Sequence, residues 1–140
     1  MELWEVVARE SIRDVVTSYN SNGDAGRFEP LLEVFADVSV MELPDRTYSG
    51  KAEISLIFTG AREKLTGAVP SYVRHFGATH KIEIVDEQNA TGRLYFAVIT
   101  RIGLDHWGRY VDRYKVVDGT WRIAHRKVII DGAQPDSVMT

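Results

Sequence analysis

The chain has 140 residues, of which 44% are hydrophobic, and this suffices for one domain, residues 1–140, with one sizeable core. Its 17 basic and 20 acidic residues give a net charge of -3 without a run of lysine and arginine, which argues against a nucleic-acid surface. Because cysteine is absent, the sequence excludes a disulfide framework, a thiol nucleophile and a thiolate zinc site. An acidic start and the lack of any long apolar run indicate neither a secretory signal nor a membrane span, so we expect a soluble, cytoplasmic domain.

Helical patterns dominate the first half of the chain. Apolar residues recur at steps of three and four from Trp4 to Tyr19, which predicts a first helix that ends within residues 20–23. Asp24 precedes a second helical pattern that runs from Phe28 to Phe35. Pro30 in this pattern is tolerable only in the opening turn, so the second helix must be short or begin close to it.

A short strand and a third helix come next. Residues 38–43 read as a strand, and residues 44–46 form a polar turn. Ser49 and Gly50 begin a helical pattern whose apolar residues share one face. We expect residues 67–72 to form a loop between this helix and the sheet.

The second half of the chain reads as consecutive strands. Residues 73–86, 92–102, 107–117 and 120–130 are rich in aromatic and β-branched residues. Asp118 and Gly119 separate the last two runs and are typical of a tight hairpin, since both positions tolerate positive φ. Helices followed by mostly antiparallel strands predict an α+β fold, in which helices cover one face of a curved sheet and leave a pocket for a small ligand.

Several motifs together resemble the SnoaL-like branch of the nuclear transport factor 2-like superfamily. They are a Tyr19-x4-Asp24 segment, the Arg74-His75 pair, the Gly108 to Arg113 segment, and Asp118 to Ile123 with Arg126 beyond it. The resemblance covers residues 5–132. It implies a conical barrel, formed by a strongly curved and mostly antiparallel sheet wrapped against N-terminal helices. It also implies an apolar cavity and a homodimer or homotrimer.

Within this family, the chain most resembles the dehydratases and dehydrochlorinases. These include scytalone dehydratase-like, bile-acid dehydratase-like and hexachlorocyclohexane dehydrochlorinase-like proteins. In that resemblance His75 matches the general base and Asp24 its carboxylate partner, while Tyr19 and Arg126 match further site residues. These enzymes need no cofactor, and the resemblance implies none here. It implies a cofactor-independent lyase that acts on a small hydrophobic molecule.

The chemistry of an elimination explains why such residue types occur together. Imidazole has a pKa near 7, so it can remove a proton beside a departing hydroxide or halide. A carboxylate bonded to its other nitrogen selects the tautomer and stabilises the imidazolium that forms. Tyr19 and Arg126 can donate to the developing oxyanion or to the leaving group, where one fixed donor is worth about 2.7–4 kcal/mol.

Each candidate also has a purely structural interpretation. Asp24 stands where an N-cap of the second helix belongs, and His75 alone reads as a half-buried histidine. Tyr19 ends an apolar stripe and fits a core position. Strict alternation places Arg126 opposite Trp121, so it is solvated or paired with Asp112 if the tryptophan points inwards.

The other histidines are lesser candidates. His80 lies five residues after His75, so a regular strand directs the two side chains to opposite faces. His106 is expected in an exposed loop, and His125, which shares parity with Trp121, is a second candidate base that lines the pocket. Their spacing fits no metal site.

Aromatic residues and His125 form the predicted lining of the substrate pocket, although most aromatics of a small domain belong to its core. The predicted lining is Phe28, Tyr72, Phe76, Tyr95, Trp107 and His125. Two other functional classes share the fold: a binding module that retains a hydrophobic ligand without turnover, and an accessory subunit of a ring-hydroxylating oxygenase. A polyketide cyclase or isomerase is a further alternative within the family.

Overall fold

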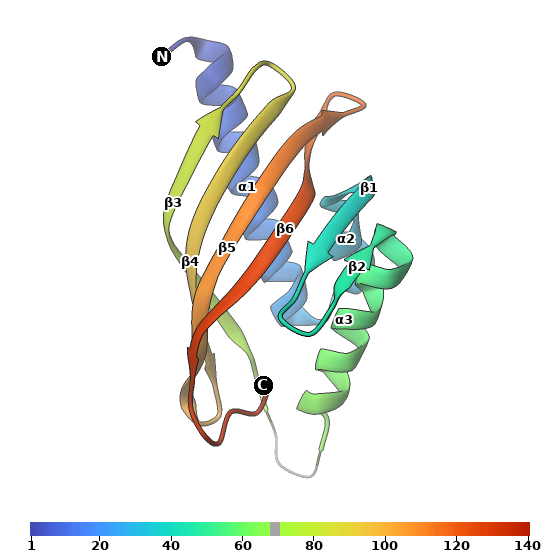
Figure 1. Ribbon diagram of the computed structural model, residues 1–140, viewed down its shortest axis with the longest axis vertical. Helices are drawn as coiled ribbons and strands as arrows, with labels where there is room; N and C mark the ends of the chain where they lie inside the picture. The colour runs from blue at the N-terminus through green and yellow to red at the C-terminus, as the bar shows by residue number, and fades with distance from the viewer. Residues whose placement is uncertain (68–70) are drawn as a thin grey trace.

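The computed structural model describes residues 1–67 and 71–140, and its architecture is α+β, as predicted (Figure 1). Three helices precede most of a six-stranded sheet. The elements are α1 (Leu3–Ala25), α2 (Phe28–Glu33), β1 (Phe35–Glu42), β2 (Thr47–Ser49), α3 (Gly50–Leu65), β3 (Arg74–Ile84), β4 (Asn89–Thr100), β5 (Gly103–Val117) and β6 (Thr120–Ala133). In the described part of the chain, none of the helices has the length and apolar character that a membrane span needs.

Helix α1 is longer than the sequence pattern predicts. Its buried residues Ala8, Ile12, Val16 and Tyr19 follow the expected three- and four-residue steps. The helix continues through Gly23 and ends at Gly26, whose φ of 73° is the left-handed conformation that closes many helices. Asp24 therefore lies in the last turn of α1, and the expected role as N-cap of α2 is wrong, because Arg27 holds that position.

The segment after α1 matches the prediction in type but not in its boundaries. Helix α2 ends at Glu33, so Phe35 belongs to β1 rather than to the helix. Pro30 is the third residue of α2, within the first turn, as the pattern requires. Helix α3 begins at Gly50 after Ser49, as predicted, whereas the three-residue strand β2 is not anticipated by the pattern. Of the expected loop at residues 67–72, residues 68–70 lie outside the described part of the chain.

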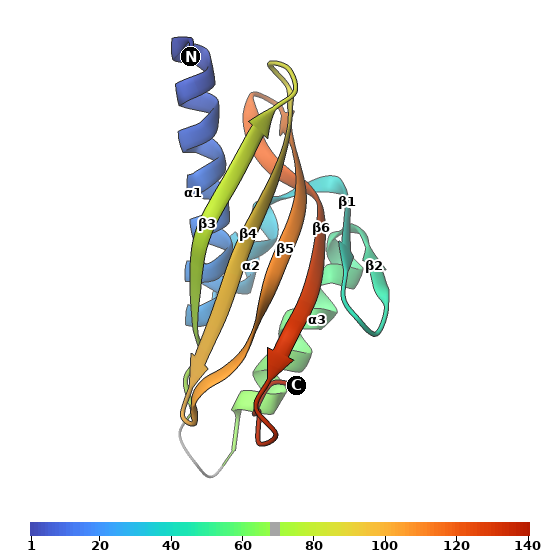
Figure 2. The same ribbon diagram turned by 60° about the vertical axis from the view of Figure 1, so that its left-hand side comes forward.

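The sheet has the strand order β2-β1-β6-β5-β4-β3 and is mostly antiparallel, as predicted. Strand β1 pairs with β6 in parallel, while the other adjacent pairs are antiparallel. Helix α1 runs along one side of strands β3 to β6, and α3 lies against β1 and β2 (Figures 1 and 2). We call the helix-covered side the inner face and the other the outer face. The predicted conical curvature stays a prediction.

The β5–β6 hairpin closes at the predicted turn. Asp118 and Gly119 have φ angles of 50° and 76°, the left-handed conformation that a two-residue hairpin turn requires. The antiparallel register runs from Val117 opposite Thr120 along both strands. This long hairpin contributes most of the polar side chains of the inner face.

Four β-bulges in the antiparallel strand pairs change which side chains face inwards. An extra residue lies at Thr79 in β3, at Asp105 in β5, and at Ala124 and Asp131 in β6, where the pairing registers shift. Thr79 has a φ of 55°, consistent with a local break in the strand. Each bulge reverses the alternation of inward and outward residues beyond it. Predictions that assume a regular strand therefore fail past these points.

Asp105 holds the C-terminal segment against the sheet. Its buried carboxylate accepts hydrogen bonds from Thr100 Oγ1 at 2.8 Å, from the Val138 backbone N–H at 2.9 Å, and from the Ser137 hydroxyl. His106 Nδ1 lies 2.8 Å from the same carboxylate, so His106 is buried, and the expectation of an exposed loop residue is wrong. Burial alone raises the pKa of Asp105, but these hydrogen bonds lower it to about 2.

We expect the stability of the domain to fall when Asp105 is protonated. The folded pKa of about 2 lies below the ordinary value of 3.8, so the stabilisation is complete above pH 4 and is lost as the pH falls towards 2. At 1.36 kcal/mol per pH unit, the loss is about 2 kcal/mol. Urea denaturation between pH 5 and pH 2 measures it, and Asp105→Asn should remove this part of the pH dependence. An unchanged acid limb in the variant contradicts the assignment.

Candidate active site

The carboxylate of Asp24 joins the end of α1 to the start of β3. Asp24 Oδ1 lies 2.6 Å from His75 Nδ1, and Asp24 Oδ2 accepts the His75 backbone N–H at 2.9 Å. The structure thus brings together the two residues that the sequence singles out. His75 lies at the start of β3, which is an edge strand of the sheet, and Asp24 lies in the last turn of α1.

This geometry defines the tautomer of His75. A carboxylate only accepts hydrogen bonds, so the proton of the neutral imidazole lies on Nδ1 and the lone pair on Nε2. In the described part of the chain, no hydrogen bond occupies Nε2. The side chains of His75 and Asp24 are 20% and 15% exposed, so the pair is largely but not fully buried. The pair has the arrangement of a general base with an orienting acid.

Arg126 lies fully buried on the inner face, where it forms a two-point ion pair with Asp112. Arg126 Nε and Nη2 donate to Asp112 Oδ1 and Oδ2 at 2.9 and 2.7 Å. Both side chains are 0% exposed. The inward orientation results from the bulge at Ala124, which turns both Ile123 and Arg126 towards the core. The predicted opposition of Arg126 and Trp121 across the sheet is therefore wrong.

Two tyrosines enclose the Arg126 guanidinium. Its Cζ lies 4.4 Å from the ring centroid of Tyr19 and 4.0 Å from that of Tyr110, which are cation–π distances. Burial raises the pKa of Tyr19, while the Arg126 charge lowers it less, so its hydroxyl stays protonated and able to donate. The Arg126 Nη1 atom has no hydrogen-bond partner in the described part of the chain, which leaves its buried N–H groups available as donors.

A chain of hydrogen bonds continues from this ion pair to His80. The Tyr114 hydroxyl donates to Asp112 Oδ2 at 2.7 Å, and His80 Nε2 lies 3.1 Å from the Tyr114 oxygen. His80 faces inwards because of the bulge at Thr79, so it shares the inner face with His75, and the opposition that a regular strand predicts is wrong. Burial lowers the pKa of His80, and Arg126 lowers it further while Asp112 raises it, so the ring is neutral at pH 7.

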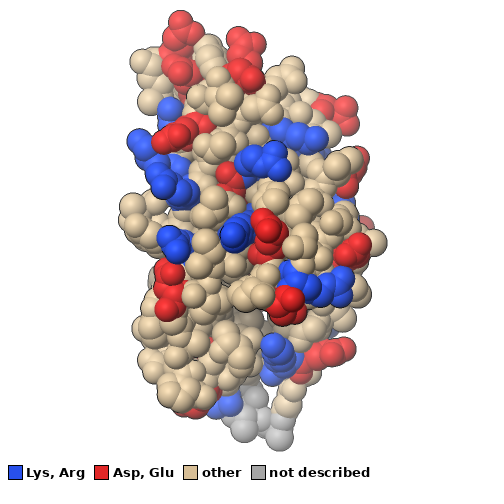
Figure 3. Space-filling model, in the orientation of Figure 1, with Lys and Arg blue, Asp and Glu red and all other residues tan. Residues whose placement is uncertain are grey.

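The Asp24–His75 pair, which we call the dyad, and the Arg126–Asp112 ion pair belong to one interior region. The charge of Asp24 raises the pKa of both Tyr19 and Tyr110, the same rings that enclose Arg126. The intervening space is occupied by aromatic side chains, since Tyr19 packs edge-on against Phe35, Phe58 and Tyr110 at centroid distances of 5.9 to 6.0 Å. A hollow is visible on the surface where β6 and α3 diverge (Figure 3).

Two cavities of the described surface lie away from the dyad. One, of about 410 Å³, is lined by Asp86 to Asn89 at the β3–β4 turn. The other, of about 450 Å³, lies between α1 and the β5–β6 turn and is lined in part by Asp14 and Trp121. Neither contacts Asp24 or His75. Groups of three or more potential metal ligands are absent from the described residues.

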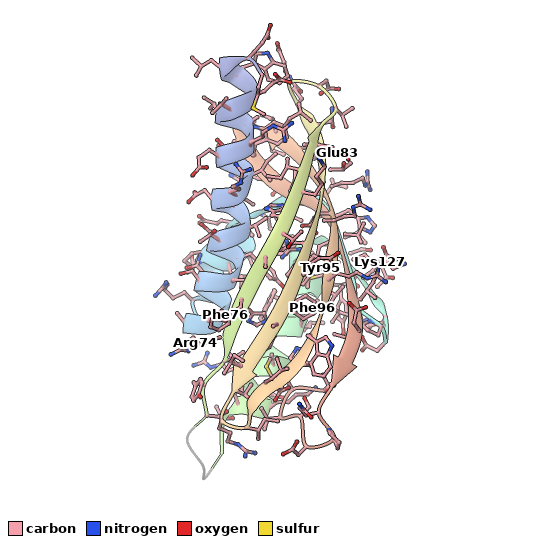
Figure 4. The ribbon with its side chains drawn as sticks, turned by 90° about the vertical axis from the view of Figure 1, so that its left-hand side faces the viewer. Arg74, Phe76, Glu83, Tyr95, Phe96 and Lys127 are labelled. Atoms are coloured by element: carbon pink, nitrogen blue, oxygen red, sulfur yellow. The ribbon has the colours of Figure 1, made fainter. Side chains whose placement is uncertain are left out.

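Most of the predicted pocket lining lies elsewhere. Phe28 is half-buried and packs against Phe58 at 6.0 Å. Phe76 and Tyr95 are 60% and 57% exposed and lie on the outer face, whereas Phe96, the neighbour of Tyr95 on β4, is buried on the inner face (Figure 4). Strand alternation explains this, because adjacent residues of a strand point to opposite faces.

The three remaining lining candidates are exposed or lie on the outer face. Tyr72 is exposed, and the ring of Trp107 lies against Gly132 on the outer face. His125 faces outwards because of the bulge at Ala124, and its Nε2 bonds to Glu42 at 2.5 Å. The expectation that His125 lines the interior is therefore wrong, and it is no longer a second candidate base.

Sequence reasoning did not include four residues of the inner face among the site residues: His80, Tyr110, Asp112 and Tyr114. The pairing of Arg126 with Asp112, which it gave as one structural alternative, is observed. Two of them, Tyr110 and Asp112, stand within the motif from Gly108 to Arg113 that supports the resemblance. Their alternation at positions 110, 112 and 114 is the signal that could have placed them on one face. His80 offers no such signal, because its orientation depends on the bulge.

We expect Gly92→Ala to disrupt the His80–Tyr114 contact. A Cβ at Gly92 would lie 2.7 Å from Tyr114 Cε2 and 3.2 Å from His80 Nε2, closer than side-chain contacts allow. Overpacking of this kind costs about 1–3 kcal/mol. Urea denaturation measures the loss. In the matched control Gly60→Ala, the added methyl group meets open space within α3, so stability should rise by about 0.5–1 kcal/mol. Equal stability of Gly92→Ala and the parent chain contradicts the packing described.

The family model of the SnoaL-like domain matches residues 4–127. No curated protein sequence matches the chain. Among solved structures, a provisionally assigned scytalone dehydratase of Novosphingobium aromaticivorans is similar at a TM-score of 0.82 and 19% identity, over 96% of this chain and 91% of that one.

Two further structures have the same fold. The hexachlorocyclohexane dehydrochlorinase LinA-type3 of Novosphingobium barchaimii is similar at a TM-score of 0.81 and 16% identity, with 96% of this chain and 94% of that chain covered. The β subunit of a provisionally assigned aromatic-ring-hydroxylating dioxygenase of N. aromaticivorans is similar at 0.73 and 19% identity, with 97% of each chain covered. At such identities these likenesses show the fold alone.

Proposed function

The chain belongs to the SnoaL-like family, and from this premise we propose that it is a cofactor-independent lyase of the dehydratase or dehydrohalogenase type. Its substrate would be a small hydrophobic molecule with an acidic C–H beside a hydroxyl or halogen. The observation that carries the proposal is the hydrogen bond of 2.6 Å between Asp24 and His75 Nδ1, which leaves Nε2 as a base. Structural neighbours of the same fold include enzymes named for both kinds of elimination.

In the proposed elimination, each residue of the site has one role. His75 Nε2 takes the proton from the substrate carbon, the electrons of that C–H bond form the new C=C bond, and the leaving group departs with its bonding pair. Asp24 stabilises the imidazolium that results, because its carboxylate already accepts the Nδ1 hydrogen. Tyr19 and Arg126 supply buried donors for the negative charge that develops on the substrate or leaving group.

A binding module that retains a hydrophobic ligand is the second candidate function. The observation that favours it is the close packing of Tyr19 with three other aromatic rings in the interior. In that case Asp24 and His75 only connect α1 to β3. A cyclase or isomerase of the same family would use the same base and differ only in the step after proton removal.

Replacement of His75 separates these functions. In His75→Ala, proton removal should fall by roughly 10²–10⁴-fold while ligand binding persists. Solvent deuterium exchange, followed by NMR on ketones that keep the acidic C–H and lack a leaving group, measures this step directly. The matched control is His125→Ala, which removes an outer-face histidine and should leave the exchange rate unchanged. A wild-type chain that binds such ketones without catalysing exchange supports the binding module.

Replacement of Asp24 tests the tautomer. In Asp24→Asn, the amide N–H would donate to His75 Nδ1 and move the ring proton to Nε2, where the base must act. We expect proton removal to slow by up to about 10⁴-fold, the loss known for the same change in a serine protease triad. Circular dichroism and urea denaturation identify any loss of fold. An Asn variant that is folded and as active as the parent chain contradicts the role of Asp24.

A further inference from the structure

We propose that residues 134–140, which follow β6, form a strap that closes the interior between α3 and the sheet, and that a small molecule enters only when this strap is released. Neither of the two cavities described above contacts the dyad, and the side chains of the dyad are largely buried. Entry of a ligand to the dyad therefore requires part of the structure to move. The inference rests on the proposed function only for the purpose of the opening.

The strap bridges a place where α3 and the sheet separate. Helix α3 packs against α2, β1 and β2, and in the described part of the chain it makes no extensive contact with β4, β5 or β6. A hollow marks this separation on the surface (Figure 3). The strap lies between the end of β6 and the end of α3 in both ribbon views (Figures 1 and 2). It thus connects α3 to a part of the sheet against which the helix does not pack.

Asp105 and Ser137 hold the strap to the sheet. The Asp105 carboxylate accepts the Ser137 hydroxyl, and also the Val138 backbone N–H at 2.9 Å. Ser137 Oγ in turn accepts the backbone N–H groups of Met139 and Thr140 at 3.3 and 3.0 Å. One hydroxyl therefore both anchors the strap and shapes the residues that follow it, so its removal should loosen the whole strap.

The attachment of the strap to α3 is the weaker one. Lys64 Nζ, in the last turn of the helix, donates to the Met139 carbonyl at 3.1 Å, and this contact is exposed. The Met139 side chain packs against the hydrophobic core but is only partly buried. Water competes with an exposed hydrogen bond, whereas the carboxylate of Asp105 is fully buried and its hydrogen bonds meet no such competition. We therefore expect the strap to detach from α3 first.

The anchor of the strap lies beside the interior. His106, the neighbour of Asp105, packs edge-on against Phe96 at 6.0 Å. Val98 on β4 pairs with both His75 and His106, so the two histidines lie in one row across the inner face. Their Cα atoms are about 10 Å apart at the usual strand spacing. Release of the strap therefore opens the interior in the row of residues that contains the dyad histidine.

The four histidines of the chain provide a direct test, because three face inwards and His125 faces outwards. Diethyl pyrocarbonate modifies accessible imidazoles, and peptide mapping by mass spectrometry gives the rate at each histidine. In Ser137→Ala, His75 should react about tenfold faster relative to His125 than in the wild-type chain, the change that loss of one hydrogen bond to a charged group produces. Ser55→Ala is the matched control and should change nothing, because its hydroxyl donates to Ala52 within α3.

A second variant keeps the test decisive if Ser137→Ala does not fold. Lys64→Met removes only the exposed contact with the strap and should raise the relative rate at His75 by about two- to fivefold. Urea denaturation of each variant separates release of the strap from general unfolding. The proposal is wrong if neither variant changes the rate at His75, or if His75 already reacts as fast as His125 in the wild-type chain. The measurement needs no turnover, so a strap that opens onto an inactive dyad would reject the lyase alone.

Discussion

The two hydrogen bonds accepted by Asp24 are the constraint on which the candidate site depends. One fixes the backbone at the start of β3, and the other fixes the ring of the same residue, His75. A single carboxylate thereby joins the last turn of α1 to the edge of the sheet and determines the tautomer of the imidazole. Gly26 makes this possible, because the helix continues to Ala25 before the left-handed residue ends it.

The β-bulges determine which other polar side chains face the interior. Regular strands would direct His75 and His80, or Ile123 and Arg126, to opposite faces. The extra residues at Thr79 and Ala124 bring all four to the inner face, where Asp112 connects Arg126 to Tyr114 and His80. The ion pair is costly to bury, and the two-point geometry together with the tyrosine hydrogen bond offsets that cost. The resulting site is polar in its contacts and compensated in its charge.

The sequence predicted the order and type of nearly all elements because their signals are local. The apolar stripe of α1, the Asp118-Gly119 turn and the pattern of strands β3 to β6 depend on neighbours a few residues apart. The Asp24–His75 pair came from a resemblance and not from periodicity, since its members lie 51 residues apart. The orientations of Arg126, His80 and His125 could not be predicted, because a bulge leaves no clear mark in sequence and reverses every side chain beyond it.

The tautomer of His75 tests the central claim most directly. Long-range proton–nitrogen NMR of the chain, labelled with ¹⁵N at its histidine rings, distinguishes a protonated Nδ1 from a protonated Nε2, and the spectrum of His75→Gln assigns the signals. At a pH where the ring is neutral, the account predicts one fixed tautomer, with the proton on Nδ1. A proton on Nε2, or the exchange-averaged signals of a free imidazole, would contradict the pairing with Asp24 and the basic role assigned to His75.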